Sequence, residues 1–387
     1  MTSPRSLRRR AVWAAPVLTV GAIGAVGAAT LLPTAASASA HPWLPARTAA
    51  QLVAAVQGST VTHLSGEVVE TARLGLPELP GSGNGANLSW QTLVTGTHTA
   101  RIWVNGADQQ RVALLGQLAE SDVVRNGRDV WTYASDTGKA SHMTLPDPAT
   151  AHRDAADPKK SGASHSVVEL TPLAAANQAL AAISPSTAVS VDPTARVAGQ
   201  KAYTLVLQPR QSGSTVSRVL IAVDAVHGVP LRVQVFAGGK RPAFETAFQN
   251  ISFRAPATSV FRFRPPKGST VATPSAASPK AAPDPAGKPA ASAKPTVLGS
   301  GWSSVVVFPA DPAGGSPLSA ITSSGAGTGR HADQIASTLA RLTKRLSNGD
   351  QLLSTALVNV LVTSDGRVLV GAVTPEVLQQ AAAGKLR

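Results

Sequence analysis

The chain has 387 residues, enough for two modest domains, and 43% of them are hydrophobic, so a sizeable core can form. It contains no cysteine, which excludes disulfides, thiol nucleophiles, thiolate metal sites and a lipid-anchoring cysteine. The net charge is +14, but four of the positive charges lie in the first ten residues. Since no basic helix or basic run interleaved with aromatic residues follows, we expect no nucleic-acid partner.

The first forty residues have the features of an export signal. Arg5–Arg10 form a cationic region, an apolar stretch runs from Ala11 to Leu32, and Ala38-Ser39-Ala40 fits a signal-peptidase site. We therefore expect residues 1–40 to be a signal peptide. The rest of the chain is then secreted or lies at the extracytoplasmic face of the cytoplasmic membrane. The alternative is an uncleaved anchor, because residues 11–32 are numerous enough to span a bilayer.

A short helix and a series of strands are predicted next. Residues 48–56 form an amphipathic helix with Thr48 as its N-cap. Alternating patterns then predict strands at 64–73, 89–95, 98–104, 109–115, 121–125 and 129–134. Asn105-Gly106 and Asn126-Gly127 are typical of two-residue hairpin turns. Residues 75–87 and 136–165 are predicted loops.

The same pattern repeats after residue 170. Thr171-Pro172 begins a helix that runs to about Ile183, with Thr171 as its N-cap. Further strands are predicted at 202–208, 216–224, 230–236, 243–253 and 259–264. In the first three of these, apolar residues occupy one face and polar residues the other, which indicates an antiparallel sheet with one buried side.

The C-terminal part is separated by a segment rich in proline and alanine. Residues 269–296 are predicted to be a linker of extended character. Residues 297–387 are expected to form a small α+β module. Its predicted strands are 302–308, 357–362 and 368–373, and its predicted helices are 334–346 and a final one that begins at Thr374-Pro375.

No motif for catalysis is present in the sequence. There is no nucleophile elbow, no S-x-x-K and no HxH or HxxxH pair of histidines. Gly325-x-Gly327-x-Gly329 lacks the Lys-Ser/Thr of a phosphate-binding loop. We therefore expect a protein that is not an enzyme and that has no metal site and no cofactor.

An antiparallel sheet with many strands and only two short helices has to bury its apolar face by curving. We therefore expect an α+β fold, in which a strongly curved antiparallel sheet forms an incomplete β-barrel that encloses the helices. A cavity between sheet and helices would suit hydrophobic ligands. The residues expected to line it are Leu52, Val56, Trp103, Trp131, Tyr133, Leu205, Ile221, Val233 and Phe248.

Three segments resemble a known superfamily. They are Ala202-Tyr203-Thr204-Leu205-Val206-Leu207, the run from Val223-Asp224 to Pro230-Leu231-Arg232, and Phe261-Arg262-Phe263-Arg264-Pro265-Pro266. They are similar to the second half of the LolA-like superfamily, which contains lipoprotein carriers and the MucB/RseB sigma-factor regulators. The likeness covers about residues 44–270, and the composition is of actinobacterial type. It implies a half-barrel that receives acyl chains, without catalysis.

Two functions remain open at this stage. One is a cell-envelope carrier or binder of lipid or lipoprotein acyl chains, in which residues 41–268 form the ligand-binding domain. The other is an envelope-stress sensor that regulates an anti-sigma factor or another membrane partner through residues 297–387. An ABC transporter is a further possible membrane partner, and we expect the protein to be a monomer.

Overall fold

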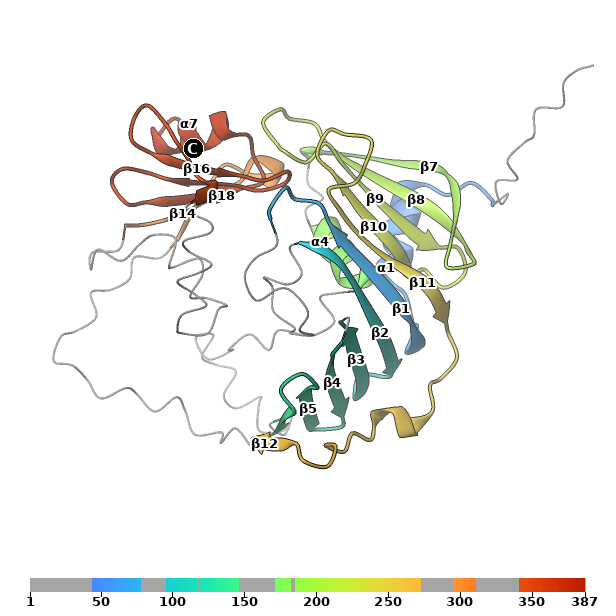
Figure 1. Cartoon of the computed structure of the whole chain (residues 1–387). Coiled ribbons are helices and arrows are strands. Elements are labelled where there is room, and N and C mark those ends of the chain that lie inside the picture. The colour runs from blue at the N-terminus through green and yellow to red at the C-terminus, as the bar shows by residue number, and fades with distance from the viewer. Residues whose placement is uncertain are drawn as a thin grey trace, which may run out of the picture. The chain divides into compact units, whose positions relative to one another are not determined.

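The structure, a computed structural model, describes residues 44–77, 95–116, 118–145, 171–181, 185–272, 295–310 and 341–386. These residues contain a 12-stranded sheet and a 6-stranded sheet, called here the large and the small sheet (Figure 1). The large sheet consists of β1 (His63–Ala72), β2 (Gly96–Asn105), β3 (Gln109–Leu115), β4 (Glu120–Asn126), β5 (Asp129–Ala134), β6 (Lys139–Thr144), β7 (Thr187–Val197), β8 (Gln200–Pro209), β9 (Arg218–Asp224), β10 (Pro230–Phe236), β11 (Phe244–Ser252) and β12 (Thr270–Ala272).

The strand order of the large sheet is β12-β6-β5-β4-β3-β2-β1-β11-β10-β9-β8-β7. All neighbouring pairs are antiparallel except β12 and β6. The sheet is curved and not closed, because β12 and β7 are its two free edges (Figure 1). Register shifts between Glu67 and Val68 and between Pro230 and Arg232 contribute to the curvature, since bulges bend a strand. The predicted curved, open α+β fold is confirmed.

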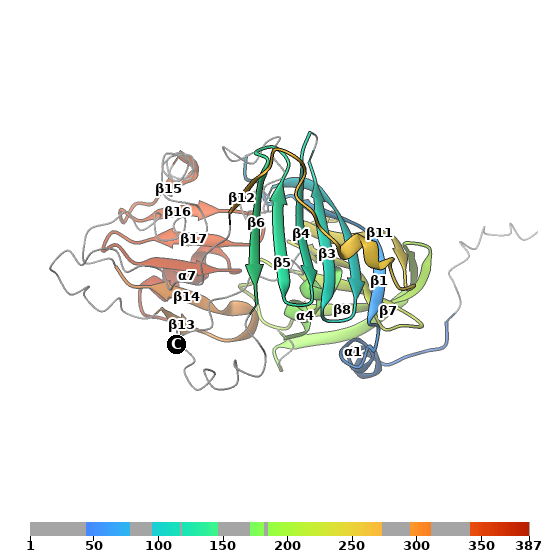
Figure 2. The same cartoon turned by 90° about the horizontal axis from the view of Figure 1, so that it is seen from below.

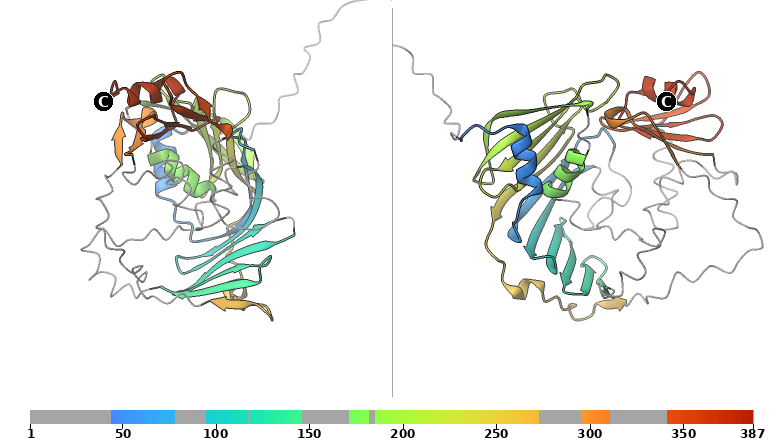
Figure 3. Two further views of the ribbon diagram at one scale, coloured as in Figure 1. Left: turned by 60° about the vertical axis from the view of Figure 1, so that its left-hand side comes forward. Right: turned by 180° about the vertical axis from the view of Figure 1, so that it is seen from behind.

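Two short helices lie against the concave side of this sheet (Figure 3). Helix α1 (Ala49–Gln57) begins with a capping box, in which Gln51 N donates to Thr48 Oγ1 and Thr48 N donates to Gln51 Oε1. Helix α4 (Pro172–Ala181) follows Thr171, whose Oγ1 accepts a hydrogen bond from Ala174 N. Both predicted N-caps are confirmed.

The strand predictions were wrong in several places. Strands β6 and β7, at the edges or next to them, were missed because β6 has few apolar residues and a proline lies within β7, at a register shift between Asp192 and Ala195. Residues 259–264 are not a strand but contain the 3-10 helix η2 (Thr258–Phe261). Residues 89–94 of a further predicted strand, and 146–165 of a predicted loop, lie outside the described residues.

The small sheet has the order β13-β14-β18-β17-β16-β15. Its strands are β13 (Thr296–Leu298), β14 (Val305–Phe308), β15 (Lys344–Arg345), β16 (Gln351–Ser354), β17 (Asn359–Val362) and β18 (Val368–Gly371). A one-turn 3-10 helix, η3 (Gly301–Ser303), precedes β14, and α7 (Pro375–Ala382) covers one face of the sheet through Leu378 and Ala381.

Three predictions for this module need correction. Lys344 and Arg345 belong to a strand and not to the end of the predicted helix 334–346, whose residues 334–340 lie outside the described part. Strand β16 was missed. The ends of the predicted linker, Thr270–Ala272 and Thr296–Leu298, are strands that pair with β6 and β14. The helix that begins after Thr374 is confirmed.

None of the helices in the described ranges combines the length and the apolar character needed to cross a bilayer. The apolar stretch 11–32 and the rest of residues 1–40 lie outside the described part of the chain. Whether that segment is a signal peptide or an anchor therefore stays a prediction.

Candidate functional site

The two faces of the large sheet carry different side chains. We call the face that packs against α1 and α4 the inner face. Residues of this face and of the two helices form one buried cluster. The cluster consists of Leu52, Val56, Ala176, Leu180, Tyr203, Leu205, Leu207, Val216, Val219, Ile221, Val223 and Val233. Alternate residues of β8 and β9 belong to it, which is the predicted one-sided pattern.

The apolar inner face continues beyond these helices onto β11, β1, β2 and β3. Directly opposed residues of neighbouring antiparallel strands share a face. The register therefore places a second row on the inner face. This inner row consists of Phe248, Val68, Ala100, Ile102, Val112 and Leu114. All six are buried, with exposed fractions of 1–5%.

A glycine on β1 makes room for an aromatic side chain in this row. A Cβ atom on Gly66 would lie 2.4 Å from Asn250 O and 3.0 Å from Phe248 Cδ1. The ring of Phe248 therefore occupies the space next to the Gly66 backbone. Helices α1 and α4 make their main contacts with β7, β8, β10 and β11, so the inner row extends the apolar surface past them.

One carboxyl group lies among these residues. Glu70 is opposite Thr246 on β11 and His98 on β2, and only 6% of it is exposed. Burial raises the pKa of Glu70 from its usual 4.5 to about 7. Sequence reasoning missed this residue. The signal that could have found it is its position two residues from both Val68 and Ala72, which places all three on one face of the strand.

The outer face is crossed by residues 253–272, here called the strap (Figure 2). The strap contacts β3 and β4 through η2 and ends as β12 beside β6. Phe261 is 1% exposed, and the ring of Phe263 lies against Trp131 and Tyr133, with centroids 5.6 and 5.7 Å apart. The phenylalanines thus lie on the side of the strap that packs on the sheet, which explains why they alternate with arginines.

Charged residues accompany the aromatic ones on the outer face. Arg111 Nε lies 2.8 Å from Asp122 Oδ1, and its guanidinium is 5.4 Å from the centre of the Trp103 ring. Arg111 Nη2 is 3.5 Å from Glu120 Oε1. Burial and then the charge of Asp122 raise the pKa of Glu120 above its usual range.

Two clefts lined wholly by described residues lie on the outer face. One, of about 700 Å³, lies between β3–β5 and the strap and is lined by residues that include Arg111, Tyr133 and Arg264. The other, of about 490 Å³, lies over β11, β1 and β2 beside Glu67 and Trp103. Both contain charged side chains of both signs, in contrast to the apolar inner row.

The nine residues predicted to line a ligand cavity fall into three groups. Five of them, Leu52, Val56, Leu205, Ile221 and Val233, belong to the cluster under the helices. Phe248 belongs to the inner row. Trp103, Trp131 and Tyr133 lie on the outer face, because the register links Trp103 through Arg111 and Val124 to Trp131, and Tyr133 is two positions further along β5. They therefore share no cavity with the other six, whose contact with a ligand stays a prediction.

The large and small sheets are joined by hydrogen bonds and by apolar contacts, at a place here called the junction. Ser214, which precedes β9, forms a β-bridge with Val373, which follows β18. The hydrogen bonds of the junction include Thr215 N to Ala372 O (3.0 Å), Thr374 N to Gly213 O (2.8 Å), Ala356 N to Leu74 O (2.9 Å) and Trp302 Nε1 to Thr187 Oγ1 (2.8 Å). Trp302, Leu357 and Ala372 also pack against the cluster under α1 and α4.

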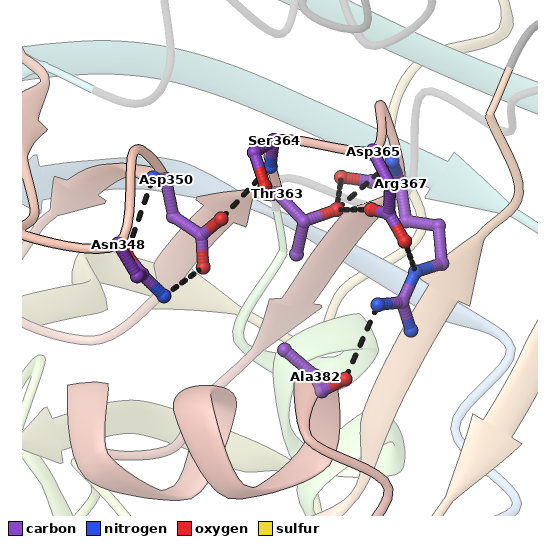
Figure 4. Close-up of polar contacts among 7 residues, drawn as sticks. All are labelled: Asn348, Asp350, Thr363, Ser364, Asp365, Arg367 and Ala382. Atoms are coloured by element: carbon purple, nitrogen blue, oxygen red, sulfur yellow. Dashed lines mark hydrogen bonds and ion pairs between the residues drawn. The ribbon is translucent and has the colours of Figure 1, made fainter.

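The small module contains a polar network with a structural role (Figure 4). The buried carboxylate of Asp350 accepts hydrogen bonds from Ser364 N at 2.8 Å and from Asn348 Nδ2 at 2.7 Å. Arg367 pairs with Asp365 and donates to Ala382 O at the end of α7. These bonds tie two turns to the helix. Within the described residues no group of side chains is suited to hold a metal ion.

No protein-family model and no curated protein matches the chain. Several solved structures are similar to it. MucB in complex with the periplasmic part of MucA is 15% identical, with a TM-score of 0.38 over 86% of this chain and 95% of that one. A MucA/MucB complex from Pseudomonas aeruginosa is 15% identical, with a TM-score of 0.39 over the same shares of the two chains.

Smaller proteins match the chain in part. A LolA-superfamily protein from Nitrosomonas europaea is 11% identical, with a TM-score of 0.23 over 56% of this chain and 99% of that one. The sequence motifs predict a similarity to this superfamily and to MucB, and the solved structures show such a similarity.

Proposed function

We propose that the protein works outside the cytoplasm as a non-enzymatic binder of lipid or lipoprotein acyl chains, and that the inner face of the large sheet is its site. The observation that supports this is the extent of the apolar inner face. Its residues belong to two buried clusters, one under α1 and α4 and one that contains the inner row on β11 and β1–β3. An elongated apolar ligand suits such a surface, because burying each CH₂ group contributes about 0.8 kcal/mol.

An inner-face substitution should separate this proposal from binding elsewhere. Ala100→Trp fills space on the inner row, whereas Thr99→Trp places the same ring on the outer face of the same strand. We expect the purified protein to take up a fluorescent fatty acid and Ala100→Trp to weaken this uptake by about tenfold or more, the effect of losing about 1.4 kcal/mol. Thr99→Trp should bind like the unchanged protein.

Native mass spectrometry of the purified protein gives an independent readout of bound lipid, and circular dichroism checks that both variants fold. A protein that is always empty and takes up no fatty acid would contradict the proposal. Equal binding by both tryptophan variants would place the ligand away from the inner row.

A second candidate function is that of a sensor, in which lipid binding changes how the small module meets a membrane partner such as an anti-sigma factor. The junction favours it, because Trp302, Leu357 and Ala372 pack against the same cluster that α1 and α4 cover. A ligand that shifts this cluster would act on the small module directly.

Hydrogen exchange at the junction can test the sensor. Addition of fatty acid should change the exchange rates of the Thr215 and Thr374 amides, which donate across the junction. Trp302→Ala should reduce this change while fatty-acid uptake persists, because the indole lies at the junction and not in the inner row. Exchange rates that stay constant on lipid binding would show that the two modules are not coupled.

A further inference from the structure

The strap on the outer face of the large sheet carries positive charge only (Figure 2). Its cationic residues are Arg254, Arg262, Arg264 and Lys267, and residues 253–272 contain neither aspartate nor glutamate. All four cationic side chains are exposed. The phenylalanines of the strap pack on the sheet, so the two arginines that alternate with them are left for solvent or for a partner.

The charges of the strap are not neutralised by the described part of the chain. Other exposed arginines there have acidic partners: Arg101 lies 3.6 Å from Glu67, and Arg125 lies 3.0 Å from Asp108. The ion pairs among the described residues include none of the four strap cations. The strap therefore presents a row of cations to which an anionic partner can bind.

A strongly exposed leucine lies beside two of these arginines. Leu118, between β3 and β4, is 90% exposed, which is more than any other large hydrophobic residue in the described ranges. Together with Arg262 and Arg264 it lines the cleft of about 700 Å³ between β3–β5 and the strap. An exposed leucine gains the free energy of burial only against an apolar partner. The surface thus combines unpaired cations with an apolar side chain that has no cover.

Two carboxylates in the same cleft leave this positive charge in place. Asp122 Oδ1 and Glu120 Oε1 lie 2.8 and 3.5 Å from the guanidinium of Arg111. The side chain of Asp122 is only 6% exposed. Both carboxylates are thus paired with Arg111, whereas the exposed cations of the strap remain accessible.

We propose that the strap and Leu118 form a surface that docks on an anionic lipid bilayer. The side chains of Arg262, Arg264 and Lys267 lie at the phosphates of the lipid headgroups, which attract lysine and arginine. The side chain of Leu118 enters the boundary between headgroups and acyl chains, where it is removed from water. This surface lies on the outer face, so the inference goes beyond the inner-face site and does not depend on it.

A nucleic acid fits this surface less well. Proteins that bind single strands use exposed aromatic rings on which bases stack. The rings beside the strap are already engaged, because Phe263 lies against Trp131 and Tyr133, and Trp131 is stacked on His142 at 4.3 Å. An exposed leucine adds nothing to the binding of phosphates but adds to insertion in a lipid interface.

Co-sedimentation of the purified protein with lipid vesicles tests the inference. Vesicles of phosphatidylcholine mixed with phosphatidylglycerol are compared with vesicles of phosphatidylcholine alone. The protein should bind the anionic vesicles and not the neutral ones at about 0.1 M salt. About 1 M salt should release most of it, because the screening length falls from about 10 Å to about 3 Å.

Two variants of the surface and one control assign the binding to the strap. The double variant Arg262→Gln/Arg264→Gln should bind anionic vesicles about twenty-five times more weakly, since each cation near the surface contributes about a fivefold factor. Leu118→Ser should weaken binding about tenfold. The control is Lys240→Gln/Arg241→Gln, which removes two exposed cations from the turn between β10 and β11 and should bind like the unchanged protein.

Three results would overturn the inference: equal binding to neutral and anionic vesicles, equal losses in the strap variant and the control, or a double-stranded oligonucleotide that binds the strap as tightly as the anionic vesicles do. Fatty-acid uptake, measured on the same variants, reports the inner face and should be unchanged by the strap substitutions. Vesicle binding by a protein that takes up no fatty acid would contradict the proposed function and leave the docking surface supported. Circular dichroism checks that each variant folds.

Discussion

Replacing Phe261 with alanine should lower the free energy of unfolding of the large-sheet domain by about 3–5 kcal/mol, the usual range for a fully buried phenylalanine. Phe261 is 1% exposed and lies in η2, the part of the strap that contacts β3 and β4. Its loss leaves a cavity between the strap and the sheet. Urea unfolding followed by tryptophan fluorescence measures the change.

Phe308→Ala is the matched control, because Phe308 is 38% exposed and should cost about 1 kcal/mol or less. The Thr270 amide, which donates to Gly138 O at the edge of the sheet, should also exchange faster in Phe261→Ala. Equal effects of the two alanine substitutions would show that the strap contributes nothing to the stability of the sheet.

Glu70→Gln should stabilise the protein at neutral and higher pH. In the unfolded chain Glu70 ionises near its usual pKa of 4.5, whereas in the folded protein it keeps its proton up to about pH 7. The stability of the unchanged protein therefore falls between these values and stays low above them. The difference corresponds to about 3 kcal/mol. Glutamine does not ionise. The free energy of unfolding of Glu70→Gln should therefore rise above that of the unchanged protein as the pH increases from about 4.5 to about 7.

Urea unfolding of both proteins from about pH 4 to about pH 8 measures this change. Glu67→Gln is the control, because Glu67 lies on the same strand but on the outer face, where it pairs with Arg101 at 3.6 Å. A difference in stability between Glu70→Gln and the unchanged protein that does not vary with pH would contradict a buried, protonated Glu70.

Much of the fold could be predicted because its signals are local. Asn105-Gly106 and Asn126-Gly127 form the turns of the β2–β3 and β4–β5 hairpins, and the alternation in β8 marks its inner residues. Thr48 and Thr171 cap helices because their hydroxyl groups accept hydrogen bonds from backbone amides three residues later. The edge strand β7 gave a weaker pattern, because a proline interrupts its alternation.

The candidate site was predicted in part. The residues under α1 and α4 were found, because a face that alternates with polar positions has to be buried. Trp103, Trp131 and Tyr133 were assigned to the same cavity by size alone, yet they face the strap. Which side of a strand meets the helices depends on pairing with distant strands, and no local pattern contains that information.

For this protein, the sequence by itself determined the elements of the sheet, the helix starts and an apolar face, since these follow from residue type and spacing along the chain. The tertiary structure alone decided three things: the strap across the outer face, the junction of Ser214 with Val373, and the burial of Glu70. All three depend on residues far apart in the chain. These residues come into contact only once the sheet has formed and curved, so no local pattern could indicate the contacts.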